Sequence, residues 1–249
     1  MSAAEPLTIT SKKIIDDTQE CKSCGYSGTG NYCSRCGQSY KIKRITLSAL
    51  VHDVFHFFTH LEKGFGYTLK QLIVTPGKMQ RAYIEGERIR HQKPFSMFFI
   101  CATVTAVSRY WIYETLLKYY NEGSISEANF FHQYMVILYI FLFPVITLIT
   151  YLLFYKSQYN YAETGVLLLY IFSFFFLTAT LIALLRFIWP QLDTAYIELP
   201  VFVFYNAITF VNFYNKSPRW LVAVKSIVSF VILFLIVQYA EDLFIKMIS

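Results

Sequence analysis

The sequence has few charged residues, and this shortage argues against a single water-soluble core. Asp, Glu, Lys and Arg make up only 15% of the 249 residues, whereas hydrophobic residues make up 55% and aromatic residues 19%. Soluble domains usually contain about 25% charged residues. The apolar excess of this chain must therefore face a medium other than water, and a lipid bilayer is the expected one.

A recognisable secretory signal is also missing. The first twenty residues contain charges of both signs and no apolar run of the length that a signal needs. We therefore expect residues 1–20 to be a polar, disordered tail and the N-terminal part to stay in the cytoplasm, where thiols remain reduced. The chain shows neither the internal repeat of duplicated transporters nor the HExxH motif of metalloproteases.

The net positive charge lies in the N-terminal part. Residues 1–95 contain 14 Lys or Arg against 8 Asp or Glu, and the rest of the chain contains 8 of each, so the net charge of +6 lies in the first segment. A basic segment can bind nucleic acid, but beside a membrane body the simpler partner is an anionic lipid surface. We expect the lipid bilayer as partner and no nucleic acid.

Four of the five cysteines form two CxxC pairs, each followed by glycine: Cys21 with Cys24, and Cys33 with Cys36. Zn²⁺ prefers four tetrahedral ligands, and one CxxC turn can direct two thiolates at a single ion. Paired disulfides would conflict with a reducing compartment, and a redox dithiol needs one CxxC in a βαβ setting. The pattern predicts a zinc ribbon over residues 21–40, with one structural ion and no open position for catalysis.

Histidines recur along a predicted helix that begins at Thr46. At ~100° per residue, His52, His56 and His60 align on one face, with Asp53 beside them and an apolar stripe opposite. Histidines one turn apart can chelate a metal, with the carboxylate as a further ligand or a supporting partner, so one interpretation is a second metal or proton-handling site. The other is a solvated polar face that happens to contain His.

Basic residues lead to the membrane entrance at the end of the amphipathic segment 41–94. These are Arg81, Arg88, Arg90 and Lys93. Near an anionic leaflet each such cation contributes ~1 kcal/mol. We predict that they contact lipid headgroups, with specific phosphate recognition as a secondary interpretation.

Long apolar runs follow in a transmembrane domain over residues 95–249. The five runs are 95–117, 133–155, 165–187, 196–213 and 220–239. Each is near the ~20 residues that span a bilayer, although the fourth is the shortest. The predicted fold is thus an all-α membrane protein. The basic approach to the first run places the N-terminus in the cytoplasm and, with five spans, the C-terminus outside; a four-span alternative would put the C-terminus inside.

Arg109 lies within the first run, ~21 Å along a helix from Phe95. Charges in lipid are costly and often mark function. Arg109 could extend toward the outer surface, or pair with Glu114 or Glu198. Because a conduction pathway would be better supported by several charged residues near mid-membrane, a structural role is favoured.

The double CxxC, followed by HDVFHFFTHLEKGFGYTLKQLIVTPGKMQRAYIEGERIRHQKPF, resembles an uncharacterised bacterial family, the domain of unknown function numbered 3667. The motif is carried by Pro76, Gly77, Lys78, Tyr83, Glu85, Gly86, Arg88, Arg90, Pro94 and Phe95. The resemblance covers about residues 21–100 and implies a zinc ribbon and several spans, but no activity. A fainter similarity, in architecture alone, is to Yip-type five-span membrane proteins.

These features favour a non-enzymatic scaffold or accessory protein in the bacterial inner membrane, whose zinc ribbon docks a cytoplasmic or membrane protein partner. No catalytic residue is assigned. One alternative is a transporter or small channel, based on the spans and Arg109. The other is a membrane metalloenzyme acting on a lipid-linked substrate, based on His52, Asp53, His56 and His60.

Overall fold

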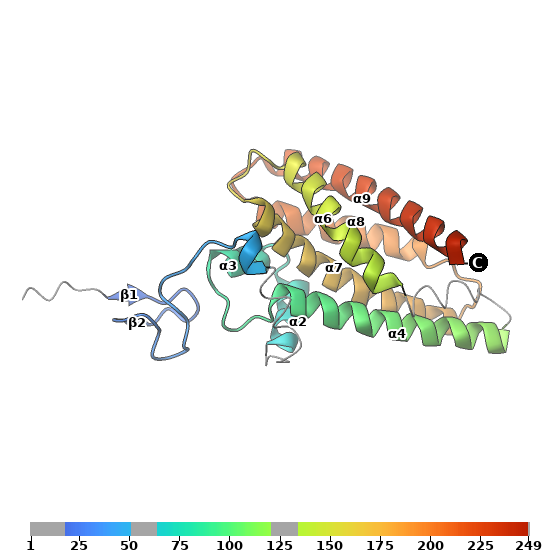
Figure 1. Ribbon diagram of the computed structural model, residues 1–249, viewed down its shortest axis with the longest axis horizontal. Coiled ribbons are helices and arrows are strands. Elements are labelled where there is room, and N and C mark those ends of the chain that lie inside the picture. Colours follow the sequence, from blue (N-terminus) through green and yellow to red (C-terminus); the bar gives the residue numbers. More distant parts are fainter. Residues whose placement is uncertain (1–17, 51–63, 121–133, 249) are drawn as a thin grey trace, which may run out of the picture. The chain divides into compact units, whose positions relative to one another are not determined.

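The computed structural model describes residues 18–50, 64–120 and 134–248. The chain divides into two units, Met1–Lys43 and Arg44–Ser249. Each unit is described by itself below, and the labels follow Figure 1. The histidine stripe falls between the first two described segments and therefore lies outside the described residues.

The first unit contains a small β-structure around the cysteines. Strand β1 (Gln19–Glu20) pairs antiparallel with strand β2 (Ser27–Gly28), and an isolated bridge joins Tyr32 to Ser39. The ordered head therefore includes Gln19 and Glu20, which the sequence analysis assigned to the tail. The reason is that the turn around the first CxxC pair reverses the chain and brings its two flanks into register.

The second unit is helical throughout most of its described part. Two short helices, α2 (Phe65–Val74) and α3 (Lys78–Glu85), come first. The longer helices are α4 (Pro94–Tyr120), α6 (Met135–Leu153), α7 (Tyr161–Ala183) with the 3₁₀ turn η2 (Leu184–Phe187), α8 (Ala195–Phe213) and α9 (Arg219–Ile248). Five of them are long and apolar enough to cross a membrane, as predicted. The chain is therefore a multi-pass, all-α membrane protein.

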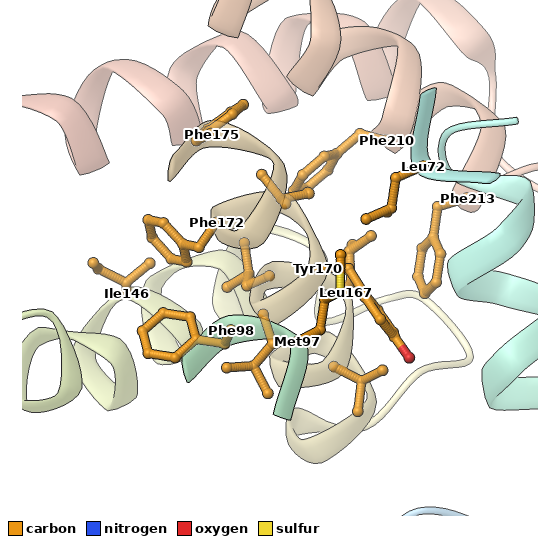
Figure 2. Close-up of a cluster of buried hydrophobic side chains, with 14 of the residues drawn as sticks. Leu72, Met97, Phe98, Ile146, Leu167, Tyr170, Phe172, Phe175, Phe210 and Phe213 are labelled. Atoms are coloured by element: carbon orange, nitrogen blue, oxygen red, sulfur yellow. The ribbon is translucent and has the colours of Figure 1, made fainter. Parts of the chain in front are cut away.

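Helix α7 forms the centre of this unit. It is apolar around its whole circumference and most of its residues are buried, whereas less than half of each of the other four spans is buried. A helix without a polar face can be packed against apolar neighbours on all sides. Side chains of α7 meet side chains from the surrounding helices, among them Phe98 of α4, Ile146 of α6 and Phe210 of α8 (Figure 2).

The outer faces of the surrounding helices carry large apolar side chains. Trp111, Phe141, Phe204 and Leu235 are all more than half exposed. Soluble proteins rarely expose so many large apolar side chains. These faces therefore suit contact with lipid, in agreement with the low charge of the sequence.

Polar contacts are concentrated where the helices of the second unit meet. The Asn206 side chain of α8 donates to the Ser226 carbonyl of α9 at 3.0 Å, and Thr180 of α7 donates to Thr105 of α4 at 3.0 Å. Lys225 donates to the Leu153 carbonyl at the C-terminal end of α6. Such bonds satisfy polar groups that lipid cannot satisfy.

A capping box begins α7 and ties the start of the second unit to it. Asn160 accepts from the backbone N–H of Glu163 at 2.8 Å, and the Glu163 carboxylate accepts from the N–H of Asn160 at 2.9 Å. The same carboxylate accepts two hydrogen bonds from Arg44, at 2.8 and 2.9 Å. Arg44, the first residue of the unit, is thereby held at the N-terminal end of α7, where a bidentate contact fixes its orientation.

Side chains of α7 and α8 donate hydrogen bonds to backbone carbonyl groups of the segment that contains α2 and α3. Tyr205 of α8 donates to the Leu72 carbonyl at 3.2 Å, Tyr170 of α7 donates to the Gln92 carbonyl at 2.6 Å, and Asn212 donates to the Pro76 carbonyl at 2.9 Å. Gly77, at the start of α3, has φ +80°, and a Cβ at this position would overlap the Thr209 carbonyl oxygen of α8. Glycine is therefore required by the backbone conformation and by the close approach.

We predict that Gly77→Ala will destabilise the second unit by at least about 2 kcal/mol, because it adds backbone strain and a steric overlap. In detergent, the midpoint of thermal unfolding should fall by at least about 4 °C. Gly66→Ala is the matched control, because a Cβ at Gly66 meets nothing within 4 Å. An equal fall in both variants, or in neither, would contradict this role of Gly77.

Candidate functional site

The four cysteines of the head converge on one point. Their sulfur atoms all lie within 4.8 Å of one another. The Sγ atoms of Cys21 and Cys36 are 3.5 Å apart, and those of Cys24 and Cys33 are 3.6 Å apart. These separations exceed a disulfide bond of about 2.05 Å. They are close to the S···S edge of about 3.8 Å in a tetrahedron with ~2.3 Å metal–sulfur bonds, so the cluster could bind a metal ion.

The two CxxC turns repeat the same backbone pattern. The N–H of Gly25 donates to the Cys21 carbonyl at 2.8 Å, and that of Gly37 donates to the Cys33 carbonyl at 2.8 Å. Both glycines have positive φ, +70° and +78°. Each glycine therefore completes a turn that a residue with a side chain would strain, and the turn directs two thiols to the same side.

The thiols influence one another's ionisation. Burial opposes ionisation of Cys33, but hydrogen bonds from backbone groups of Cys36 and Arg35 and from the neighbouring thiols lower its pKa to about 6. Burial and the three neighbouring thiols raise the pKa of Cys36 to about 12. The first thiolate thus forms readily and disfavours the next. A cation at the centre would remove this conflict, which fits a metal-binding donor set.

The donor set is closed by the protein itself. All four corners of the tetrahedron are cysteines, and Cys21 and Cys33 are only 2% exposed. Metal sites that act in catalysis keep one position for water or substrate. The arrangement therefore suits a structural ion.

Two aromatic residues that are close to the cysteines in the sequence have exposed side chains. Tyr26 is 43% exposed and Tyr32 is 68% exposed. Tyr26 follows the first CxxC turn, and Tyr32 immediately precedes Cys33. Exposed tyrosines on a rigid small domain offer contact area at low cost in side-chain entropy.

Only the beginning of the histidine helix lies within the described residues. Thr46 accepts a hydrogen bond from the N–H of Ala49 at 3.3 Å, and the helix begins at Leu47. Thr46 therefore acts as the N-cap of the helix that was predicted to begin there. His52, Asp53, His56 and His60 lie outside the described residues, and the second metal or proton site stays a prediction.

Two of the four predicted headgroup residues contact helix ends. Arg81 donates to the Asn212 carbonyl near the end of α8 at 3.1 Å. Arg88 donates to the Tyr83 carbonyl at the end of α3 at 3.2 Å, and its guanidinium lies over the Tyr83 ring. Cations favour the C-terminal ends of helices, where carbonyl groups point outward. These structural contacts were missed by the sequence analysis, because they depend on tertiary packing.

The other basic residues before the membrane differ in exposure. Arg90 is exposed, whereas Lys93 is half-buried. His91 is buried beside the rings of Tyr67 and Tyr83. Burial and the nearby Arg90 lower the pKa of His91 to about 4, so it is neutral at pH 7 and adds no charge to this cluster. Contact with lipid headgroups stays a prediction.

Arg109 pairs with Glu198, one of the two partners that the sequence suggested. The Nη2 atom of Arg109 on α4 lies 2.9 Å from Oε1 of Glu198 on α8, and both side chains are mostly buried. Close by, Tyr139 of α6 donates to Glu241 of α9 at 3.1 Å. All four residues line one cavity of about 280 Å³ within the helical unit. The sequence analysis missed Glu241 because it ended the fifth span at Tyr239, whereas α9 continues to Ile248.

A comparison with family models gives one match. Residues 62–106 match the family described as "Protein of unknown function (DUF3667)". This confirms the resemblance for those residues, which include α2, α3 and the first part of α4. The cysteine cluster lies before the matched stretch, and the zinc ribbon and the Yip-type similarity stay predictions. No curated protein and no solved structure matches the chain.

Proposed function

We propose that this protein is a scaffold or accessory protein of the bacterial inner membrane, with a zinc-ribbon head that docks a protein partner in the cytoplasm. The observation that carries the proposal is the closed four-cysteine cluster in a small unit of its own. A closed donor set stabilises a surface for recognition and leaves no metal position for a substrate. The helical unit anchors this head in the membrane.

Zinc is the metal that the donor chemistry favours. Four thiolates in a tetrahedral arrangement suit Zn²⁺ or iron–sulfur chemistry among the common biological metals. Two CxxC turns that close on one centre, each completed by glycine, are typical of zinc ribbons. When bound, the ion would hold the two turns together and supply folding free energy to a unit that is too small for its own apolar core.

We predict that the purified chain will contain one zinc ion, measured by elemental analysis. Cys33→Ser should abolish zinc binding, because three thiolates and a hydroxyl form a much weaker site. The matched control is Cys101→Ser, since Cys101 is buried within α4 and the zinc content of this variant should equal that of the native chain. Zinc that survived Cys33→Ser would belong to another site, such as the histidine stripe, and iron or no metal would contradict the assignment.

The exposed tyrosines of the head support a docking role. Tyrosine is enriched at the centres of protein interfaces, where it combines an apolar ring with a polar tip. Tyr32 is more exposed than Tyr26 and immediately precedes a cysteine of the cluster. Recognition by Tyr32 would therefore depend on the metal that fixes the adjacent turn.

We predict that Cys21→Ser and Tyr32→Ser will lose the same partner when the chain is recovered from native membranes. The first substitution should disrupt the head by removing a metal ligand, and the second should remove a contact while zinc remains bound. Cys101→Ser is the control, because it replaces a cysteine of the helical unit and should leave the partner set unchanged. Identical partner sets for the native chain and all three variants, with each chain folded, would contradict the docking role.

The distribution of charge supports an N-terminus in the cytoplasm. Basic side chains gather where the chain enters α7 and leaves α8: Arg44 donates to the Gln158 carbonyl, Lys216 donates to the Gln158 side chain, and Arg81 donates to the Asn212 carbonyl. Toward the other ends of the helices the cavity contains Glu198 and Glu241. Basic residues prefer the cytoplasmic side of a membrane.

Five spans place the two ends of the chain on opposite sides of the membrane, so a reporter fused after Ser249 should lie outside the cytoplasm. Alkaline phosphatase fused at this position should therefore be active, and a fluorescent protein fused there in a separate chain should not fluoresce. The control is the same pair fused after Ser217, in the loop between α8 and α9, where the readings should be reversed. Fluorescence at Ser249 would contradict the orientation or the fourth crossing.

A further inference from the structure

All five candidate spans contribute to one cavity. Its volume is about 280 Å³, and its lining includes residues of α4, α6, α7, α8 and α9. Ligand sites in proteins typically measure about 300–1,000 Å³ and often lie between the helices of bundles. The volume of this cavity lies just below that range, so the cavity suits a small ligand. The proposed docking role of the head does not involve this cavity.

The wall of this cavity is largely aromatic. The rings of Phe175 on α7 and Phe202 on α8 stack with centroids 4.3 Å apart, and Phe230 on α9 meets Phe175 edge-on at 6.1 Å. On the α6 side, the Tyr139 ring lies 5.1 Å from that of Phe176. Aromatic faces carry partial negative charge and attract cations, more strongly where water is excluded.

The ionisable groups of the cavity include more carboxyl groups than basic groups. Its described lining contains the guanidinium of Arg109 and three carboxylates, on Asp193, Glu198 and Glu241. Arg109 is paired with Glu198, and Asp193 accepts from the N–H of Ala195 at the start of α8, where the helix favours an anion. Glu241 accepts a hydrogen bond from the Tyr139 hydroxyl. The basic residue of the described lining, Arg109, forms its ion pair with Glu198 and not with Glu241.

We propose that this cavity binds a small organic cation with an apolar body, such as a substituted ammonium ion. The aromatic rings of four helices would contact the apolar body and the cation, and Glu241 would compensate the charge. An anion would meet an excess of carboxylates, and a purely apolar ligand would leave Glu241 uncompensated in a medium of low dielectric constant. This inference concerns the membrane body and does not depend on the head.

Equilibrium dialysis of radiolabelled benzyltrimethylammonium against the full chain in phosphatidylcholine nanodiscs would test the proposal, with protein-free nanodiscs as the background. We expect saturable binding that unlabelled probe displaces. Tetramethylammonium should compete more weakly, because it lacks the apolar body, and benzenesulfonate should not compete. Effective competition by benzenesulfonate would overturn the proposal, because it would assign recognition to Arg109 and to anions.

Glu241→Gln should weaken binding of the probe at least about tenfold, because it removes one negative charge and retains an acceptor for Tyr139. Glu114→Gln is the matched control, since Glu114 is exposed on α4 and does not line the cavity; the affinity of this variant should equal that of the native chain. Phe202→Leu, which removes an aromatic face with little change in volume, should weaken binding several-fold and provides a second test if Glu241→Gln does not fold. No saturable binding by the native chain, or native affinity in both cavity variants, would overturn the proposal.

Discussion

The enclosure of α7 is the constraint on which the rest of the helical unit depends. This helix has apolar side chains on every side, and it is the span that the other helices cover most completely. Helices α4, α6 and α8 pack against it directly, and the short helices α2 and α3 close its remaining side. The surrounding helices in turn expose apolar faces of their own. The polarity of the molecule is thus lowest at its centre and on its lipid-facing surface, with polar groups concentrated at the helix interfaces and ends.

Polar interactions at the two ends of the unit serve different purposes. At the N-terminal end of α7, Asn160 and Arg44 satisfy the cap and the Glu163 carboxylate in one network. At the other end, the pair of Arg109 and Glu198 crosses between helices beside a cavity that still contains other acidic groups. A network in which each charge has a partner fixes geometry, whereas an excess of one sign leaves a site that a ligand can complete.

Local patterns of the sequence were sufficient for part of this structure. The double CxxC predicted the cysteine cluster because two residues between cysteines fix the geometry of each turn, and the apolar runs predicted five spans because length and hydropathy determine them. The contacts of Arg81 and Arg88 with helix ends, and the presence of Glu241 in the cavity, were not predictable in this way. They depend on packing that a local pattern does not reveal, and α9 extends beyond the apolar run that indicated it.

The position of Arg44 has a consequence for the segment that joins the two units. The last cysteine of the cluster, Cys36, precedes Arg44 by eight residues, and an extended chain of that length reaches at most about 29 Å. Because Arg44 is held by Glu163, this connecting segment ends at a fixed point on the helical unit. The connecting segment therefore loses conformational freedom at this end, and a substitution of Arg44 or Glu163 would return that freedom to it.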